Sequence, residues 1–319
     1  MKLFSIVIPS LNAGAYLERA LQSVLAQAGE DTEIIVVDGG STDGSVEIIQ
    51  AFGNRGEDLT QRRRGAEGSA GVGGSANAIG ANQAAKDNFR TLELSNSRTF
   101  LRWCSEPDGG QSDALNKGFA RAQGQYLFWV NADDLLLPGT LARAREYLAA
   151  HPACDWLAGN LVYVDEQDRV LWCARDGQWR DRLYRHAPVR VYGPTSIFRR
   201  DLFERVGGFD VSLHYVMDTD LWLRFKAAGA RFHRLGHYCW AFRVHGASKT
   251  SGDLAGRTDP RMAEEQRRMY AKNGLAVTRA GLLMQRGWRL LNGCYVRAWL
   301  DTRRYCGHTV AAMESVKRG

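Results

Sequence analysis

Short apolar runs alternate with amphipathic segments along the first half of the chain. The apolar run at 4–9 is followed by a polar loop and by apolar positions at helical spacing over 16–25. The run at 33–38 is followed in the same way by a glycine-rich turn and a helical pattern over 46–52, and a third strand is expected at 98–103. Strands that alternate with helices are typical of a doubly wound, mostly parallel sheet with flanking helices. The pattern therefore predicts an α/β fold.

A run of five apolar residues, Tyr126 to Val130, predicts a strand that is buried on both faces at the centre of the sheet. Asn131, Asp133 and Asp134 follow at its carboxyl end, which is where open α/β sheets bind ligands. Two adjacent carboxylates at such a place need water, a hydrogen-bond donor or a cation to offset their charge. Taken alone, a metal site and a polar loop that caps the next helix explain these acids equally well.

Two more carboxylates stand at the start of a helix in the second half. A strand is expected over 194–200 and a short helix over 201–206. A longer amphipathic helix comes next, with Asp218 just before it and Asp220 in its first turn. The helix dipole favours a carboxylate at either position, and capping of the helix is a sufficient role for either acid.

The periodic pattern breaks between about 54 and 97, where small residues replace apolar ones, and a flexible insertion is expected there. Gly71 and Gly73 resemble the start of a dinucleotide fingerprint, but they do not follow a strand and the match is rejected. The catalytic unit is therefore expected over 1–255, with this insertion inside it and a helical extension over 256–319.

The extension contains an amphipathic pattern over 279–304. Apolar side chains recur at helical spacing and arginines fall on the opposite side of the same wheel. The apolar positions are Met284, Trp288, Leu291, Tyr295 and Trp299, and the arginines are Arg286, Arg297 and Arg304. Such a helix can lie on an anionic membrane surface, or it can dock on the catalytic unit with its arginines in water. The sequence leaves both interpretations open.

Composition narrows the class of function. The 319 residues are 45% hydrophobic and 24% charged, as in an ordinary globular protein. The net charge is +7, but residues 279–319 alone carry +6, so the rest of the chain is no general surface for nucleic acid. Six scattered cysteines contain no CxxC pair and no disulfide framework, which suits the cytoplasm. Pro9 interrupts the first apolar run too early for a signal sequence or a membrane span.

Four segments together resemble the family 2 glycosyltransferases, which are inverting enzymes of the GT-A fold that transfer a sugar from a nucleotide-sugar donor. The segments occur in the order of that family, and the resemblance covers roughly residues 3 to 250. They are 8–12, 36–45, 106–118 and 131–134. The resemblance implies a Rossmann-like, nucleotide-binding sheet with a C-terminal helical appendage.

The resemblance also implies roles for particular residues. The donor-binding set that it suggests is Pro9, Asn12, Asp38, Asp108, Asp113, Lys117, Asn131 and Asp133. A cofactor of Mg²⁺ or Mn²⁺ is implied, with Asp133, Asp134 and His245 as ligands, and Arg243 and Lys249 are candidates to pair with phosphate. This chain has Asn131 where the family has the first acid of its metal signature, and an amide brings no negative charge.

For the reaction itself, Met217-Asp218 occupies the place of the family's acid-Asp motif, so Asp218 is implied as the general base, with Asp220 in reserve. The function implied is metal-dependent hexosyl transfer from a UDP-linked donor to a glycan or lipid-linked acceptor in surface polysaccharide synthesis. The expected place is the cytoplasm, with peripheral contact at the inner face of the membrane. Two alternatives are a nucleotidyltransferase, for which the loop at 10–14 lacks basic residues, and a nucleotide-binding scaffold without turnover, which Asn131 would suit.

Overall fold

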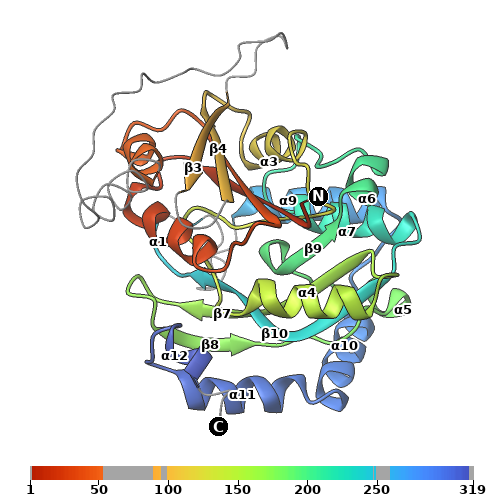
Figure 1. Cartoon of the computed structure of the whole chain (residues 1–319). Coiled ribbons are helices and arrows are strands. Elements are labelled where there is room, and N and C mark those ends of the chain that lie inside the picture. Colours follow the sequence, from red (N-terminus) through yellow and green to blue (C-terminus); the bar gives the residue numbers. More distant parts are fainter. Residues whose placement is uncertain (1, 53–88, 95–98, 247, 249–258, 316–319) are drawn as a thin grey trace, which may run out of the picture.

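The computed structural model describes residues 2–52, 89–94, 99–246, 248 and 259–315. Within these ranges the strands form one sheet (Figure 1), in the order β3-β4-β2-β1-β5-β9-β7-β10-β6, with β8 paired to β7. The strands are β1 (Phe4–Ser10), β2 (Thr32–Asp38), β3 (Arg90–Leu94), β4 (Thr99–Ser105), β5 (Tyr126–Trp129), β6 (Leu135–Leu136), β7 (Trp156–Val164), β8 (Val170–Ala174), β9 (Ser196–Arg199) and β10 (Phe232–Arg243). Strands β1, β2, β4, β5, β7 and β10 run in one direction, so the expected mostly parallel α/β sheet is confirmed.

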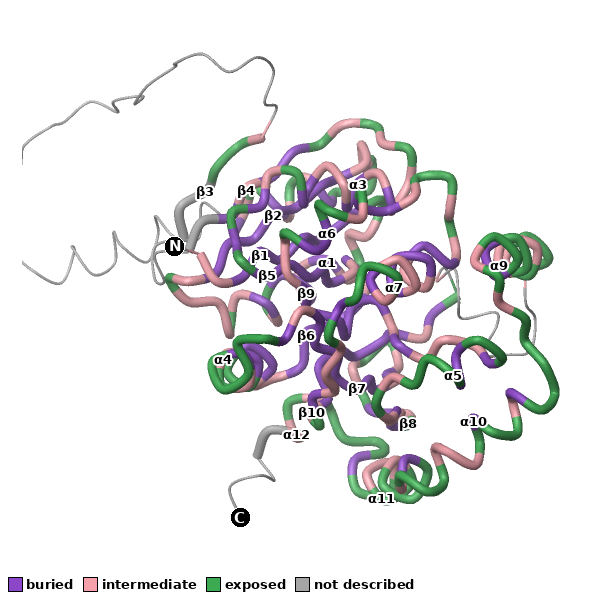
Figure 2. Tube along the Cα trace, turned by 90° about the vertical axis from the view of Figure 1, so that its right-hand side faces the viewer, coloured by how far each residue is buried: buried purple, intermediate pink, exposed green. Residues whose placement is uncertain are grey.

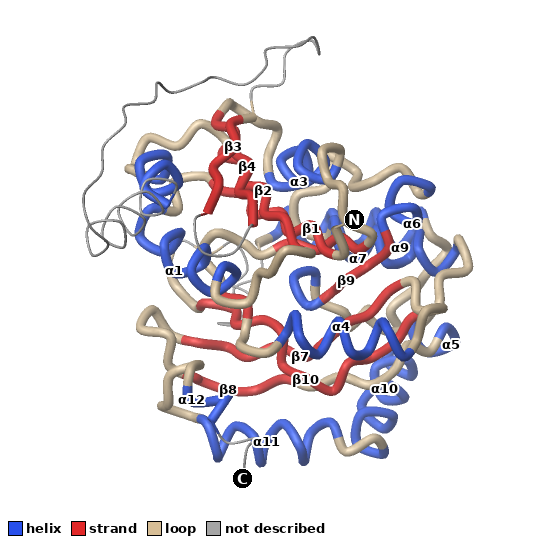
Figure 3. Tube along the Cα trace, viewed as in Figure 1, coloured by secondary structure: helices blue, strands red, loops and turns tan. Residues whose placement is uncertain are grey.

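Helices flank the strands on both sides (Figure 3). A helix that spans 45–52 follows β2. The other helices are α1 (Gly14–Leu25), α3 (Gln111–Phe119), α4 (Thr140–Ala150), α5 (Asp181–Tyr184), α6 (Arg200–Arg205), α7 (Met217–Ala227), α9 (Pro260–Lys272), α10 (Arg279–Leu291), α11 (Cys294–Tyr305) and α12 (Ala312–Ser315), with a 3₁₀ turn η1 (Gly193–Thr195) before β9. In the described ranges, none of them combines the length and the apolar character that crossing a bilayer requires.

Strand β1 shows how the helices are held. Ile6 and Ile8 belong to the core layer that includes Leu17 of α1, whereas Val7 belongs to the opposite layer with Leu115 of α3. Successive side chains of a strand point to opposite faces, so an unbroken apolar strand has to be covered on both sides. All seven residues of β1 are buried accordingly.

A stack of tryptophans joins the central strand to the second half of the sheet. Trp129, the last residue of β5, stacks on Trp222 of α7 with ring centroids 6.2 Å apart, and Trp222 stacks on Trp156 of β7 at 4.6 Å. All three rings are almost fully buried. Large buried aromatic rings contribute much of a core's stability. The stack therefore fixes α7, which carries Asp218 and Asp220, against the end of the central strand.

Two sequence expectations need correction. The insertion expected to about 97 is shorter, because Arg90–Leu94 form β3 and pair with the free edge of β4; residues 53–88 lie outside the described part. The pattern over 279–304 is not one helix: Gly293, with a φ of 66°, separates α10 from α11. Trp288 also turns inward, and the Arg180 guanidinium lies over its ring.

Candidate active site

A cavity of about 600 Å³ opens at the carboxyl ends of β1 and β5. This is the edge where parallel α/β sheets bind ligands. Its wall is completed by η1, by the loop before α7 and by α9. Five of the residues singled out from the sequence line this one cavity: Pro9, Asp108, Asn131, Asp133 and Asp218.

Asp38 and Asn12 do not line this cavity. The fully buried carboxylate of Asp38 accepts hydrogen bonds from the amides of Gly40 and Ser41, at 3.1 and 2.9 Å, and from the hydroxyl of Ser105 at 2.7 Å. Asn12 accepts from the Thr42 amide at 2.9 Å. Both side chains tie the loops after β1, β2 and β4 together, and these loops carry lining residues such as Leu11 and Asp108.

Asp113 and Lys117 also lie outside the cavity lining. Asp113 accepts from the Gly109 amide at 2.9 Å and pairs with Lys117 at 3.2 Å, and these two contacts hold its pKa below the usual range. Asp108 does border the cavity and accepts from the Gly110 amide at 2.8 Å. The pair formed by Asp113 and Lys117 therefore stabilises the loop that presents Asp108.

The turn after β5 divides its polar residues between two tasks. Asp134 is buried and accepts from the Asn131 side-chain amide at 2.7 Å and from the Arg243 backbone amide at 2.8 Å. Burial and the neighbouring Asp133 raise the pKa of Asp134 well above its usual range. Asn131 in turn accepts from Gln111 at 2.8 Å. Asn131 and Asp134 thus build the turn, and the oxygens of Asp134 are taken up by the protein.

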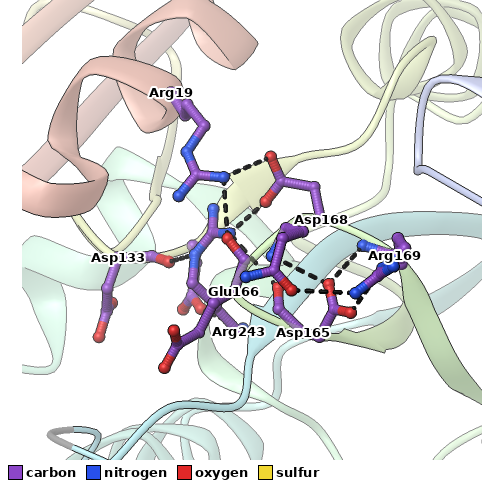
Figure 4. A network of polar contacts seen from close by, with 9 residues as sticks. Arg19, Asp133, Asp165, Glu166, Asp168, Arg169 and Arg243 are labelled. Atoms are coloured by element: carbon purple, nitrogen blue, oxygen red, sulfur yellow. Dashed lines mark hydrogen bonds and ion pairs between the residues drawn. The ribbon is translucent and has the colours of Figure 1, made fainter.

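Arg243 of β10 holds this turn in place through its side chain (Figure 4). Its side chain is fully buried, and its Nε donates to the backbone carbonyl of Asp133 at 2.7 Å. The guanidinium also pairs with Asp168, which Arg19 of α1 contacts at 3.0 Å. Arg243 is therefore not available to a phosphate, contrary to the expectation from the sequence. Lys249, the other candidate, lies outside the described residues.

Asp133 and His245 form the remaining candidate for a metal site. His245 Nε2 lies 3.0 Å from Asp133 Oδ2, and the Asp133 side chain is 34% exposed. Among the described residues no group of three His, Cys, Asp or Glu side chains surrounds one point. Two adjacent ligands of an octahedral Mg²⁺ site, each about 2.1 Å from the ion, are about 3 Å apart, and such ions often take only one or two protein ligands and complete their shell with phosphate oxygens and water. This pair could therefore supply two ligands to such an ion, and the other ligands would come from outside the protein.

Asp218 lies in the first turn of α7 and borders the same cavity. One of its oxygens accepts from the Gly193 amide at 3.1 Å and the other from the Thr219 amide at 2.6 Å. Burial raises the pKa of Asp218 to about 6. A carboxylate with this pKa is ionised at neutral pH and is a stronger base than an ordinary aspartate.

Asp220 does not lie in this cavity. Its buried carboxylate pairs with Arg224 at 2.8 Å and borders a separate hollow of about 710 Å³ beside α9. A helix turns by about 100° per residue, so positions two apart face different sides. The structure separates the two candidate bases for this reason.

Helix α9 supplies residues that the sequence did not single out. Met262 and Gln266 line the cavity, and Glu265 accepts from the backbone amides of His214, Tyr215 and Val216 at 2.7 to 3.0 Å. These amides lead directly into α7. A glutamate in a surface-like helix carries no pattern that points to this contact, so no sequence signal could have found it. The helical extension therefore begins with an element that takes part in the site.

Comparisons with known proteins identify the family of the chain. The family model described as "Glycosyl transferase family 2" matches residues 5–87 and 80–207. An uncharacterized glycosyltransferase of Rickettsia prowazekii is 24% identical over 230 residues, which are 70% of this chain and 58% of that protein. A PGL/p-HBAD biosynthesis glycosyltransferase of Mycobacterium bovis is 28% identical over 229 residues, which are 70% of this chain and 69% of that protein.

Solved structures show the same fold. Residues 1–349 of S. aureus TarS in complex with UDP superpose with a TM-score of 0.53 at 17% identity, over 88% of this chain and 68% of that one. The same protein in complex with UDP-GlcNAc gives a TM-score of 0.52 at 16% identity, over 86% and 71% of the two chains. The fold is thus of the GT-A type. The match of the family model over more than half of the sequence shows that the chain belongs to glycosyl transferase family 2.

Proposed function

We propose that this glycosyltransferase moves a hexose from a nucleoside diphosphate sugar to an acceptor hydroxyl, with inversion at the anomeric carbon and Asp218 as the general base. The observation that carries the proposal is the common cavity: Asp133, which lies beside His245, and Asp218, whose pKa is raised to about 6, both line it. A single displacement needs an activated hydroxyl on one side of the sugar and a stabilised leaving group on the other.

Each step can be assigned to a residue of this chain. Pro9 of β1 and Asp108, which follows β4, line the cavity, and the nucleotide would lie against them. The oxygen of the acceptor hydroxyl bonds to the anomeric carbon while Asp218 accepts the proton of that hydroxyl. The bond from the anomeric carbon to the diphosphate oxygen breaks in the same step. A divalent cation held by Asp133 and His245, Mg²⁺ or Mn²⁺, would neutralise the charge that develops on the leaving diphosphate. Gly193 and Thr219 orient Asp218 through their amides.

UDP is the nucleotide that we propose first, because the structural neighbour TarS was solved with UDP and with UDP-GlcNAc. For the acceptor we propose a glycan or lipid-linked saccharide in surface polysaccharide synthesis, reached by the enzyme from the cytoplasmic side of the membrane. The wall opposite the nucleotide supports a saccharide, because aromatic rings suit the C–H faces of sugars. Its aromatic residues are Tyr163, Tyr192, Trp240 and Phe242.

A panel of UDP-, GDP- and TDP-sugars with Mn²⁺ tests the proposal, with release of the nucleoside diphosphate as the readout. One donor should turn over, and Asp218→Asn should lower turnover by about 10²- to 10⁴-fold while UDP binding is retained. Asp201→Asn is the matched control, since Asp201 is an exposed acid on α6. Tight nucleotide binding with no turnover of any donor would replace the enzyme by a nucleotide-binding scaffold. Undiminished turnover in Asp218→Asn would remove Asp218 from the mechanism.

A further inference from the structure

Helices α10 and α11 expose an unusual amount of apolar surface. Of the twelve large apolar side chains that are exposed in the described part of the chain, eight lie on these two helices. They are Leu283, Met284, Leu290, Leu291, Tyr295, Val296, Trp299 and Leu300, with exposed fractions from 38% to 85%, and they are called the outer face below. Figure 2 shows both helices at the rim of the molecule and largely exposed. Such a concentration marks an interaction surface.

Contacts on the inner side hold this face outward. On α10, buried Gln285 donates to the Pro188 carbonyl at 2.6 Å, and Gly281 lies so close to the His186 carbonyl that no side chain would fit. On α11, Asp301 pairs with Arg175 at 2.7 Å, and Thr302 accepts from the Cys173 amide at 2.9 Å. Neither helix can therefore turn its apolar side inward without losing these bonds.

The exposed charges on the same two helices have one sign. Their exposed charged residues are Arg279, Arg286, Arg297, Arg303 and Arg304. The acid that α11 contains, Asp301, faces inward and is used by Arg175 and by the Tyr238 hydroxyl. The guanidinium of Arg303 lies 4.9 Å from the ring of Trp299, so cationic and apolar groups are interleaved on one surface.

The combination of exposed apolar residues and exposed arginines indicates what binds to the outer face. A second copy of the chain in a two-fold interface would bring these arginines against one another with no exposed acid on the two helices to pair with them. A bilayer with anionic headgroups satisfies both kinds of group, because leucines and aromatic rings enter the boundary of the acyl chains while arginines reach the phosphates. We propose that the outer face of α10 and α11 docks on the surface of an anionic phospholipid bilayer, with both helices lying along it.

Vesicle co-sedimentation of the full chain tests this inference without any use of glycosyl transfer. The membrane inference can therefore fail while the proposed function stands, and the proposed function can fail while the membrane inference stands. The chain should bind vesicles of phosphatidylcholine mixed with phosphatidylglycerol, and more weakly those of phosphatidylcholine alone. The substitutions Leu290→Gln, Leu291→Gln, Trp299→Gln and Leu300→Gln, combined, should weaken binding by at least about tenfold. Val211→Gln is the control, because Val211 is 52% exposed and belongs to neither of these helices.

A second pair of variants isolates the charge. Arg286→Gln with Arg297→Gln should weaken binding to the anionic vesicles by roughly thirtyfold, since each basic residue near such a surface contributes about a fivefold gain. Arg143→Gln with Arg205→Gln changes the net charge equally at exposed positions on α4 and α6, and should change binding little. Equal losses in the two double variants would show a net-charge effect and overturn the assignment to this surface.

Other outcomes also contradict the proposal. Absence of binding to the anionic vesicles overturns it, and so does binding that the quadruple variant leaves unchanged. A concentration-dependent dimer that the quadruple variant abolishes, without vesicle binding, would assign the outer face to a second copy of the chain. Thermal unfolding of every variant is measured alongside, and because the substituted side chains are exposed it should match the wild type.

Discussion

At the scale of single residues, Asp218 shows how the surroundings of an acid change its chemistry. It accepts two backbone hydrogen bonds, from Gly193 and Thr219, that would favour the ionised form, yet burial outweighs them and raises its pKa to about 6. The opposite balance holds at Asp113, where the Gly109 amide and Lys117 lower the pKa. Among acids of one kind, the environment therefore distinguishes a base from a loop anchor.

The raised pKa of Asp218 predicts the pH dependence of turnover. Protonated Asp218 cannot accept a proton, so kcat should fall about tenfold per unit below pH 6 and level off above it. The sign for stability is opposite: because the folded-state pKa exceeds 3.8, the folded state gains from protonation, and this gain is lost as the pH rises through about 6. Asp218→Asn should therefore melt at a higher temperature than the wild type at pH 8, and the difference should shrink towards pH 5.

Kinetics over this pH range and thermal melts check both statements. A kcat profile without an inflection near pH 6 would contradict the assignment of Asp218, provided that UDP binding stays constant over the same range.

Asp133 and His245 predict a metal affinity that depends on the nucleotide. The protein offers two ligands, so Mn²⁺ should bind weakly to the free chain and more tightly when UDP supplies phosphate oxygens. Asp133→Asn and His245→Ala should each weaken Mn²⁺ binding in the presence of UDP by at least about tenfold. Calorimetric titration measures this directly, with Asp201→Asn as the control. Equal affinity in all four proteins would place the cation elsewhere.

At the scale of elements, the start of α7 depends on a helix that is distant in sequence. Glu265 of α9 accepts from three successive amides before α7, at 2.7 to 3.0 Å, and the N-cap residue Val216 has no polar side chain to cap that end. The carboxylate of Glu265 at this end also suits the helix dipole, as do the first-turn acids Asp218 and Asp220. Because Asp218 is the second residue of α7, the position of the base depends on this contact.

Glu265→Ala should thus lower kcat by roughly tenfold or more, because it releases the backbone that leads into α7 and so displaces Asp218 from the reacting hydroxyl. Glu265→Gln keeps an acceptor and should recover part of the loss. UDP affinity should change little in either variant, which separates positioning of the base from damage to the donor site. Glu264→Gln is a close control, since the neighbouring Glu264 pairs at the surface with Arg267 and Arg268. A kcat loss of the same size in Glu264→Gln would refute the positioning role.

At the scale of the whole molecule, the last helices have an exposed side and a side that packs against the core. Their outer side carries the exposed apolar residues, and their inner side closes a core layer in which Tyr305 packs with Val170, Cys173 and Tyr238. Val310 and Met313 pack against the same layer. The extension is therefore part of the fold and is not a detachable tail (Figure 1).

A chain shortened to end at Asn273 should unfold at a clearly lower temperature or fail to accumulate, because it uncovers this layer and unpairs Arg175. Loss of a buried Tyr305 alone is expected to cost about 3 to 5 kcal/mol. The quadruple substitution on the outer face should leave the melting temperature unchanged. Thermal unfolding of the two proteins makes the comparison, and a stable shortened chain would contradict this account.

The sequence by itself determined the alternation of strands and helices, the buried central strand and the placing of carboxylates at strand ends. These features follow from local periodicity, since the unbroken apolar run of a strand such as Tyr126–Trp129 predicts that the strand is buried on both faces. The helix break at Gly293 and strand β3 were missed because one depends on a single left-handed residue and the other on pairing with β4. The spacing of apolar residues over about ten positions predicts neither of these two features.

Only the tertiary structure decided which acids face the cavity. The sequence does not distinguish the adjacent Asp133 and Asp134. In the structure, Arg243 and Asn131 donate to the two oxygens of Asp134, whereas Asp133 lies beside His245. Asp218 and Asp220 differ for a similar reason, because Arg224 pairs with Asp220 alone. A side chain's direction and charge state depend on neighbours more than 100 residues away, or on the far side of a helix, and residue order does not contain that distance information.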